Sequence, residues 1–401
     1  MKCLFIDYGA TNIKSCLYDA VTDGFYDFRT YKCPKNISVY PEYVISIKSL
    51  SSITQSILSQ GNFDVVFVST QMHGFSYYDG ASVSDYISWR DERGKVFENI
   101  KCYKNSGIEP RKGLPLFNIP IISQETIQDR IKILSLPGAI LKEIGKFSDI
   151  CHNTVTCGFG THTLKTGKVD CDIQKFIGNK VVFPKTTTEI EAVGYFLVDN
   201  REVPVFSPVG DLQCAVLGSG IRSDEVCINL GTGSQVSMVS EDCNDKTDNR
   251  AFFDGKILNT KTHIPSGRAI NSFLAFMETM GYRRDFWNLI KNSTAKDIIS
   301  STMDISLQTF GGFTGSIGNL SESNMTCNNL ELSIIRCYVE QYRKHLELFE
   351  AKSILLSGGV VKNCPVIAEV FRQTYNTPVR VNNTLYEETF LGLKKISRYV
   401  M

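Results

Sequence analysis

The sequence of 401 residues contains no run of eighteen or more apolar residues, so we expect no membrane-spanning helix. It starts MKCLFID and shows neither a charged leader nor a long apolar segment with a small-residue cleavage site, and we therefore expect a cytoplasmic protein. The 13 cysteines include no C-x-x-C pair, which argues against a zinc ribbon and against a disulfide framework. We expect reduced cysteines that pack as small apolar side chains.

An excess of one charge is also missing, because 43 Lys and Arg residues face 42 Asp and Glu residues. A balanced total indicates no basic face for a nucleic acid partner, and it favours small-molecule chemistry. The chain is 42% hydrophobic and 11% aromatic, which is enough apolar material for the cores of two domains of ordinary size.

A degenerate repeat is the most informative feature present. Residues 3–19 read CLFIDYGATNIKSCLYD, and residues 226–240 read VCINLGTGSQVSMVS. Each copy has an apolar strand, an acidic or amide residue (Asp7 or Asn229), a glycine-containing turn and a second alternating strand, which predicts a β-hairpin. A tight glycine turn exposes backbone N–H groups that suit phosphate oxygens. Single hairpins of this kind are common, but two copies at half-chain spacing indicate a duplicated nucleotide-binding core.

Helix and strand patterns alternate through the rest of the chain, after a polar connection that follows the first hairpin. The expected elements are helices over 45–59, 269–280 and 330–351, a helix that starts at Asp211, a helix after Gly358 and Gly359, and strands over 63–69 and 353–357. No low-complexity linker separates the two halves. The repeat alone therefore places the boundary between an N-terminal domain, 1–222, and a C-terminal domain, 223–401.

Seven short segments carry a resemblance to a known family. In chain order they are IDYGATNIK (6–14), QMHG (71–74), SWRDER (88–93), VGDLQ (209–213), INLGTGSQVS (228–237), LLSGGVVKN (355–363) and EETFLGLKK (387–395). Together they resemble the FGGY family of carbohydrate kinases over nearly the whole chain. The resemblance implies an α/β fold of two actin-like (ribonuclease H-like) ATPase domains with an active-site cleft between them. It also implies phosphate transfer from ATP to a sugar hydroxyl.

The resemblance assigns nucleotide-binding roles to both glycine turns and to the segment 355–363. Asp7 would hold Mg²⁺ through water, because Mg²⁺ keeps several waters and prefers one or two carboxylates. Lys14 would add positive charge, unless it is a solvated lysine at a strand edge. An ordinary strand-to-helix turn is the alternative for Gly358 and Gly359. The residues expected to bind ATP are Asp7, Gly9, Thr11, Asn12, Lys14, Gly231, Thr232, Gly233, Ser234, Gly358, Gly359 and Asn363.

Asp211 is the expected general base, which accepts the proton of the attacking sugar hydroxyl. Its place at a helix start is expected to lower its pKa and keep it ionised, and its alternative role is to cap that helix. The residues expected to bind the sugar are Gln71, Met72, His73, Trp89, Asp91, Arg93 and Gln213. The alternatives are a satisfied, partly buried histidine for His73 and a core residue for Trp89.

The finer resemblance concerns the substrate. QMHG occurs in ketose kinases of the family, and GDLQ, CHNTVTCGFG (151–160) and NLGTGSQVS are most similar to sedoheptulokinases. We therefore expect sedoheptulose, with His152 and Asn153 as partners of its extra hydroxyls. Two departures from the family are Ala10 in place of a threonine and an abbreviated region at 113–147, which bear on substrate and assembly.

Several alternatives to this substrate and activity stay open. A xylulokinase, a ribulokinase or another polyol kinase of the same family is possible on the same motifs. The alternative from another class is a catalytically silent sugar-binding regulatory protein, since a fold does not fix a function. We expect a monomer or a homodimer.

Overall fold

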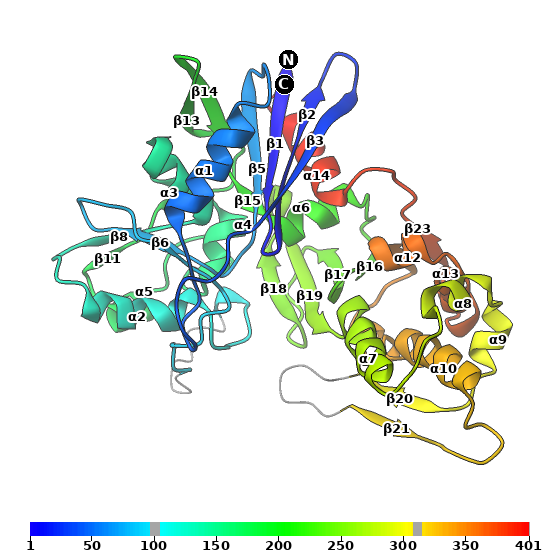
Figure 1. Ribbon diagram of the computed structural model, residues 1–401. Coiled ribbons are helices and arrows are strands. Elements are labelled where there is room, and N and C mark those ends of the chain that lie inside the picture. The colour runs from blue at the N-terminus through cyan, green and yellow to red at the C-terminus, as the bar shows by residue number, and fades with distance from the viewer. Residues whose placement is uncertain (97–104, 308–314, 401) are drawn as a thin grey trace.

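The computed structural model describes residues 1–96, 105–307 and 315–400, and its backbone is organised around two mixed sheets (Figure 1). The first sheet has the order β3 (Gly24–Lys32), β2 (Asn12–Asp19), β1 (Lys2–Tyr8), β5 (Val65–Thr70), β14 (Arg201–Phe206), β13 (Ala192–Val198) and β9 (Gly145–Phe147), and β15 (Val209–Gly210) also pairs with β5. The second has the order β18 (Asp248–Ala251), β19 (Ile257–Ile264), β17 (Ser234–Ser240), β16 (Glu225–Leu230), β22 (Ser353–Ser357) and β23 (Val379–Val381).

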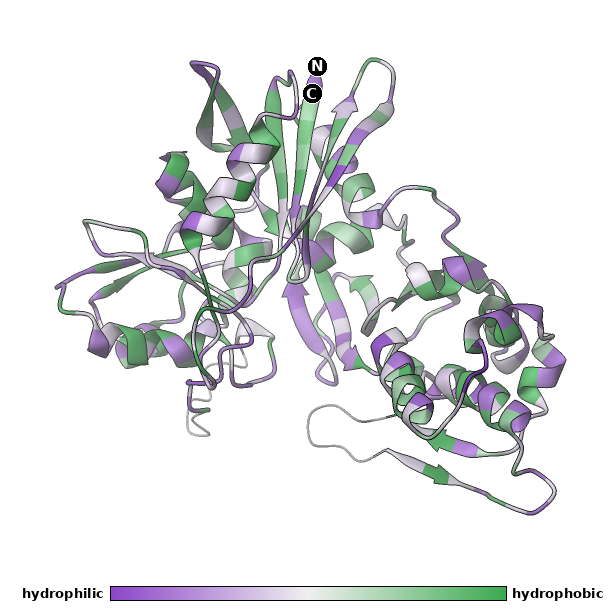
Figure 2. Ribbon diagram, viewed as in Figure 1, coloured by the Kyte–Doolittle hydropathy of each residue, from purple (hydrophilic) through white to green (hydrophobic). Residues whose placement is uncertain are grey.

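The two sheets repeat one arrangement, as the sequence predicted. In the first, β1 pairs antiparallel with β2 and parallel with β5. In the second, β16 pairs antiparallel with β17 and parallel with β22. A third antiparallel strand follows in each, β3 beside β2 and β19 beside β17. β1 and β5 read as hydrophobic runs in Figure 2, and every residue of β5 is buried, as expected for central strands that are covered on both faces.

The helices that matter for the site are α1 (Ile47–Leu58), α6 (Asp211–Gly218), α7 (Gly267–Thr279), α12 (Gly359–Asn363) and α14 (Glu388–Ser397). Among them, α1 and α7 match their predicted ranges to within two residues, and α6 and α12 start where predicted. The predicted strand 353–357 is β22. The smaller helices used below are α4 (Asn153–Thr156), η2 (Cys157–Phe159), α5 (Cys171–Ile177), α8 (Phe286–Asn292) and α13 (Val366–Thr374). Within the three described stretches of chain, no helix combines the length and apolar character needed to cross a membrane.

Two predictions about elements were wrong. The polar connection after the first hairpin contains β3, which pairs antiparallel with β2 and exposes aromatic as well as polar side chains. The predicted helix 330–351 is divided into α10 (Cys327–Glu340) and α11 (Arg343–Leu346). Gln341 and Tyr342 keep right-handed helical angles, but Tyr342 N–H bonds to the Val339 carbonyl three residues back. This tightened turn is typical of a helix end.

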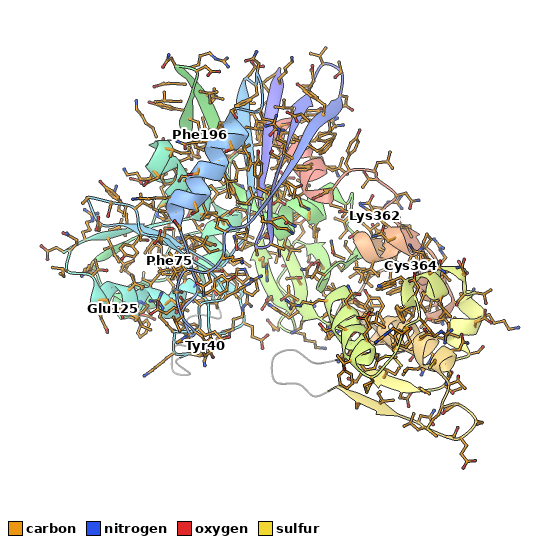
Figure 3. All side chains as sticks on the ribbon, in the orientation of Figure 1. Tyr40, Phe75, Glu125, Phe196, Lys362 and Cys364 are labelled. Atoms are coloured by element: carbon orange, nitrogen blue, oxygen red, sulfur yellow. The ribbon has the colours of Figure 1, made fainter. Side chains whose placement is uncertain are left out.

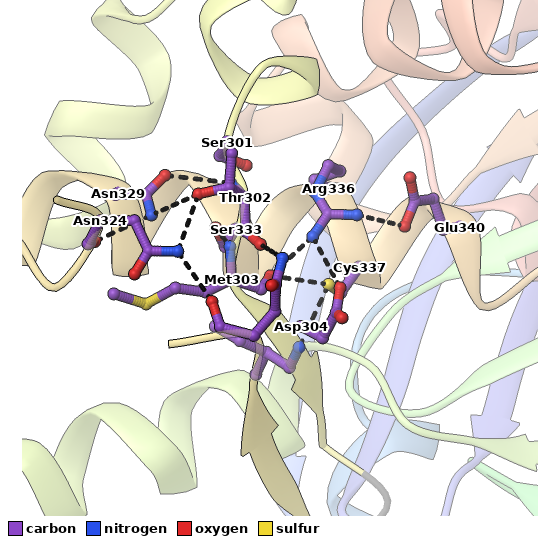
Figure 4. Close-up of polar contacts among 12 residues, drawn as sticks. Ser301, Thr302, Met303, Asp304, Asn324, Asn329, Ser333, Arg336, Cys337 and Glu340 are labelled. Atoms are coloured by element: carbon purple, nitrogen blue, oxygen red, sulfur yellow. Dashed lines mark hydrogen bonds and ion pairs between the residues drawn. The ribbon is translucent and has the colours of Figure 1, made fainter. Parts of the chain in front are cut away.

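Polar contacts attach the loop before the small hairpin of β20 (Asp304–Ser306) and β21 (Ser316–Gly318) to α10 (Figure 4). The Ser333 hydroxyl of α10 accepts from the Met303 N–H at 3.1 Å. Arg336, one turn further along α10, donates to the Met303 carbonyl at 2.6 Å and to Asp304 at 3.2 Å. This corner of the molecule is therefore held by side chains as well as by the apolar core beneath α10.

The last helix returns to the first sheet. α14 packs against α6, β1 and β5, and Figure 1 shows it beside the first sheet. The backbones of α6 and α14 touch, because a Cβ at Gly392 would lie 2.0 Å from the Cys214 carbonyl oxygen and one at Gly218 only 1.7 Å from the Glu388 carbonyl oxygen. The strands of the first sheet all precede residue 222, and those of the second all follow it. α14 follows residue 222 in the sequence but packs against the first sheet.

Candidate active site

Two carboxylates lie at the carboxyl ends of neighbouring parallel strands. Asp7 of β1 is in register with Ser69 of β5, and the Ser69 hydroxyl donates to Asp7 Oδ1 at 2.7 Å. Gly210 of β15 pairs with Thr70, one residue further along β5, and Asp211 follows it directly. In open α/β sheets, ligands bind outside the carboxyl ends of such strands. The sheet therefore places Asp7 and Asp211 at one ligand-binding edge.

Burial changes the protonation of both acids. The pKa of Asp7, which is 9% exposed, is raised to about 7, chiefly because the carboxylate loses water and further because of the charge of Asp211. The pKa of Asp211 is raised to about 6 by loss of water to the surrounding walls, although its side chain keeps some contact with solvent. The expectation of a lowered pKa at Asp211 was wrong, because desolvation exceeds the contributions of the helix start and of Arg250.

The helix start also differs from the prediction in detail. Gly210 is the N-cap residue of α6, and Asp211 is its first helical residue. Asp211 Oδ1 accepts the N–H of Leu212 at 2.8 Å, so the carboxylate still satisfies one free donor of the first turn. The group predicted to act as general base is therefore also the group that satisfies this donor.

The two glycine turns are equivalent. Gly9–Thr11 connects β1 to β2, and Gly231–Gly233 connects β16 to β17, each with three residues outside the strands. A Cβ at Gly9 would lie 2.8 Å from the Asn12 carbonyl oxygen, so this turn closes too tightly for a larger residue. Asn12 Oδ1 is buried without a hydrogen-bond partner among the described residues. Lys14 is in register with Asp7, and its ammonium binds Glu387 at 2.7 Å.

A cavity of about 860 Å³ opens beside the second turn. Residues predicted to bind ATP line it: Gly231, Thr232, Gly359 and Asn363. Cys364, which Figure 3 labels at the end of α12, also lines it. Gly358 does not line the cavity but has φ of 93°, and a Cβ there would lie 2.6 Å from the Leu230 carbonyl oxygen. Its glycine is therefore required for β16 and β22 to approach closely.

Sequence reasoning missed the opposite wall of the cavity. That wall comes from α7 and α8 and consists of Gly267, Arg268, Asn271, Ser272, Ala275, Trp287 and Lys291. The indole N–H of Trp287 donates to Asn271 Oδ1 at 3.2 Å, which fixes the ring. Two features of the sequence could have indicated this wall. One is Trp287, since the chain has only two tryptophans, and the other is the row of small residues along one face of 267–275.

The segment after β5 presents unsatisfied polar groups. Gln71 is 5% exposed, and neither its amide nitrogen nor its amide oxygen finds a partner within the described chain. His73 has φ of 62° and bonds through Nδ1 to the Gly158 carbonyl at 2.7 Å, while its buried Nε2 is unpartnered among those residues. Buried polar groups are nearly always hydrogen-bonded in proteins, so these atoms point to a polar ligand. Met72 packs beside them against Gly158 and Gly210.

Other predicted sugar residues are engaged by the protein. The fully buried Asp91 carboxylate accepts from the Tyr43 N–H at 2.9 Å and from Arg93 at 3.0 Å, so this pair holds its own segment in place. Arg90 covers the ring of the partly buried Trp89, with 5.1 Å to the centroid. Gln213 donates to the Ala251 carbonyl at 3.2 Å, and its Oε1 has no partner in the part of the chain that the structure describes.

His152 is not available to a ligand. Its Nδ1 accepts the N–H of Thr154 at 3.2 Å and its Nε2 bonds to the Thr188 carbonyl at 3.2 Å. The expectation that it meets extra sugar hydroxyls was wrong, because the ring caps α4. The adjacent Asn153 is different, since its buried Oδ1 has no partner among the described residues.

Comparison with known proteins relates this fold to solved structures of sugar kinases. No family model and no curated protein matches the sequence. The ligand-bound xylulose kinase of Lactobacillus acidophilus matches 99% of this chain and 89% of its own, with 14% identity and a TM-score of 0.84. A gluconate kinase from the same organism matches 99% and 88%, with 14% identity and 0.83. Plasmodium falciparum glycerol kinase with ADP matches 100% and 89%, with 14% identity and 0.82. The chain therefore has the two-domain, actin-like α/β fold of these proteins, as predicted.

Proposed function

We propose that this protein is an ATP-dependent sugar kinase that transfers the γ-phosphate of ATP to a hydroxyl of a ketose. The observation that carries the proposal is the placement of Asp7 and Asp211 at adjacent strand ends, beside the first of two equivalent glycine turns. Phosphoryl transfer requires a held cation, cradled phosphates and a group that takes the hydroxyl proton. We further propose that the protein acts in the cytoplasm as a monomer or homodimer.

Asp7 fits the role of magnesium ligand. Its Oδ1 already accepts from Ser69, and its burial disfavours the bare charge, which a divalent cation would compensate. When bound, Mg²⁺ would neutralise charge on the phosphates, and one or two carboxylates with several waters suffice to hold it. The turn amides of Gly9–Asn12 and Gly231–Ser234 would face phosphate oxygens, and the cavity beside Gly231 would hold the adenosine.

Asp211 would take the proton from the attacking hydroxyl. The sugar oxygen forms its bond to the γ-phosphorus, the bond from that phosphorus to the ADP oxygen breaks, and the hydroxyl proton moves to the Asp211 carboxylate. A carboxylate with a pKa of about 6 is a better base than an exposed one and is mostly ionised at pH 7. Gln71, His73 and the other unsatisfied groups would align the sugar for this attack.

Sedoheptulose is the first candidate substrate, and xylulose, ribulose and other polyols are the alternatives. The motifs at 151–160 and 210–213 support the seven-carbon sugar, and the unpartnered Asn153 Oδ1 offers an acceptor for one of its hydroxyls. A site built to bind a hydroxyl discriminates against a sugar that lacks it, since its own group is then left unpaired. Comparing kcat/KM for the three ketoses tests this assignment, which a five-carbon sugar equal to or better than sedoheptulose would overturn.

A coupled assay of ADP release tests the kinase proposal. Wild-type protein with MgATP should release ADP slowly alone and much faster with a ketose from a panel of ketoses, aldoses and polyols. If no sugar raises ADP release above the background, the catalytically silent sugar-binding protein becomes the better proposal. Retention of both Asp7 and Asp211 favours the enzyme, because a binding protein needs no proton acceptor beside a phosphate turn.

A further inference from the structure

The edge strand β18 of the second sheet is polar in sequence yet buried. It reads Asp-Asn-Arg-Ala, stands out as hydrophilic in Figure 2, and exposes none of its residues by more than 7%. It lies against η2 and α4 of the other domain, and the Ala251 carbonyl accepts from the Gln213 side chain in the first turn of α6. β18 therefore reaches an element beside each of two predicted site residues, since Gly158 of η2 is the partner of His73 and Gln213 lies two residues after Asp211 in α6.

A cluster of charges fixes this strand to the loop before α2 (Pro115–Glu125). The buried Asp248 carboxylate accepts the Glu109 N–H at 2.9 Å and lies 3.6 Å from both the Arg111 and the Arg250 guanidinium groups. One carboxylate therefore serves two cations. It cannot satisfy all the donors of either guanidinium.

Arg250 has a donor atom without a hydrogen-bond partner among the described residues. The atom is the buried Nε, and the side chain is 5% exposed. Its charge contributes to the lowered pKa of His73, after burial and Arg111, and opposes the raised pKa of Asp211. β18 brings Arg250 to this site, because the strand packs against η2 and α4 and the neighbouring Ala251 carbonyl accepts from Gln213. A buried charged donor without a partner lowers the stability of the protein unless a ligand accepts from it.

His73 supplies the complementary atom. Because a carbonyl oxygen can only accept, the bond to Gly158 places the proton on His73 Nδ1 and leaves Nε2 as an acceptor. The site thus offers a donor at Arg250 Nε and an acceptor at His73 Nε2. A hydroxyl group both donates and accepts, so a polyhydroxy sugar can satisfy the two atoms at once.

We propose that Arg250 is a sugar-binding, specificity-determining residue contributed by the second domain, with Nε donating to a sugar oxygen opposite His73. The proposal rests on the proposed kinase function and deepens it. It means that the sugar contacts both domains, so that the second domain holds the substrate as well as the nucleotide. None of the sugar-binding residues predicted from the sequence lies in that domain.

The variant Arg250→Lys tests the proposal, since it keeps the charge beside Asp248 but loses Nε. We expect KM for the sugar to rise roughly 10- to 150-fold, the range for one hydrogen bond to a charged group, with KM for MgATP changed less than about 2-fold. Arg372→Lys, an exposed arginine of α13 that pairs with Glu369, is the matched control and should behave as wild type. An unchanged sugar KM in Arg250→Lys would overturn the proposal.

Two further measurements separate this proposal from the proposed function. Arg250→Gln keeps a neutral donor, and Asp248 keeps Arg111 and the Glu109 N–H in either variant, so we expect both variants to melt cooperatively. If both fail to fold, Arg250 belongs to the scaffold and the proposal is wrong. If wild type releases no ADP with any sugar, calorimetric titration of the sugars tests the proposal instead. Weaker sugar binding by Arg250→Lys than by wild type would support the proposal. Equal binding by the two proteins, or no sugar binding by wild type, would overturn it.

Discussion

At the scale of single residues, one substitution can separate the proposed catalytic role of Asp211 from its structural role at the start of α6. Asp211→Asn keeps a side-chain oxygen that can accept the Leu212 N–H, and Asn is as good as Asp at a helix start. We expect the variant to keep its fold and its sugar binding but to lose turnover by roughly 10²- to 10⁴-fold, the usual effect of removing a positioned base. Steady-state kinetics and sugar titration of both proteins measure this. Turnover near the wild-type value would assign Asp211 to structure.

The pH profile provides an independent readout of the same residue. Since the base must be ionised and its pKa is raised to about 6, kcat/KM for the sugar should rise with pH up to about 7 and then level when MgATP is saturating, because a bound cation would keep Asp7 ionised. A profile already level at pH 5 would mean that the bound substrates, or another group, control the ionisation. The residual activity of Asp211→Asn should lack this rise.

Asp7 is expected to lower the stability of the ligand-free protein, because its carboxylate is buried. Its raised pKa means that the native state binds the proton more tightly than the unfolded state. Stability from this group is therefore complete below the unfolded value of 3.8 and is lost as pH rises to about 7. Asp7→Asn, which is neutral throughout, should raise the free energy of unfolding at pH 8 by at most about 4 kcal/mol and leave it nearly unchanged at pH 4.

Denaturant unfolding at the two pH values measures this difference. Asp172→Asn on α5 is the control, since its exposed carboxylate pairs only with Lys175 across one helix turn, and it should change stability little at either pH. An Asp7→Asn protein that is less stable than wild type at pH 8 would contradict the account of a strained, buried carboxylate.

Residue roles could be predicted where a short motif fixes the backbone, and not where tertiary contacts decide. Asp7 and the glycines of both turns lie where the strand and turn patterns predicted. Asp91 could face either the sugar or Arg93. The outcome depends on how the segment 88–93 folds against Tyr43, and no local sequence pattern predicts that contact. Arg250 was missed for the same reason, because its burial follows from a contact between strands and helices far apart in the sequence.

At the scale of elements, the crossing of α6 and α14 positions Asp211, the proposed catalytic base. A Cβ at Gly392 would meet the Cys214 carbonyl at 2.0 Å, so Gly392→Ala should push the helices apart and destabilise the protein by about 1–3 kcal/mol or more. Because α6 begins at Asp211, activity should fall as well. Thermal melting and turnover measure both effects. Gly318→Ala in β21 is the control, since the nearest atom to its Cβ would be 3.9 Å away, and equal losses in the two variants would contradict the account.

Elements with strong periodicity were predictable, and those shaped by neighbours were not. α1 and β22 match their predicted ranges to within a few residues, because amphipathic spacing and a short apolar run between breakers are local signals. β3 is half polar and becomes a strand only because β2 offers its edge. α10 ends at Glu340 although nothing in the residues 338–343 is a helix breaker.

At the scale of the whole molecule, the two tryptophans, Trp89 and Trp287, lie in different halves of the chain, which allows the two proposed sites to be observed separately. Trp287 lines the cavity of the second domain, so MgADP alone should change its fluorescence. Trp287→Phe should abolish this response, whereas Trp89→Phe should retain it. A response that disappears with Trp89→Phe instead would place the nucleotide outside the cavity.

The overall architecture was the most predictable level, because a duplicated hairpin and the order of the motifs specify it without any knowledge of side-chain contacts. The return of α14 to the first sheet and the hydrogen bond between Ala251 of β18 and Gln213 of α6 were not predictable from the repeat. Both contacts join the two halves of the chain, and both involve α6, the helix that begins at Asp211.

Product analysis tests the central claim most directly. Wild-type protein, MgATP and the best sugar of the panel are incubated together, and ADP and phosphorylated sugar are measured in the same sample, with Asp211→Asn in parallel. The account predicts ADP and sugar phosphate in equal amounts from the wild type and a loss of both in the variant. ADP accompanied by free phosphate and no phosphorylated sugar, or equal product from the two proteins, would contradict it.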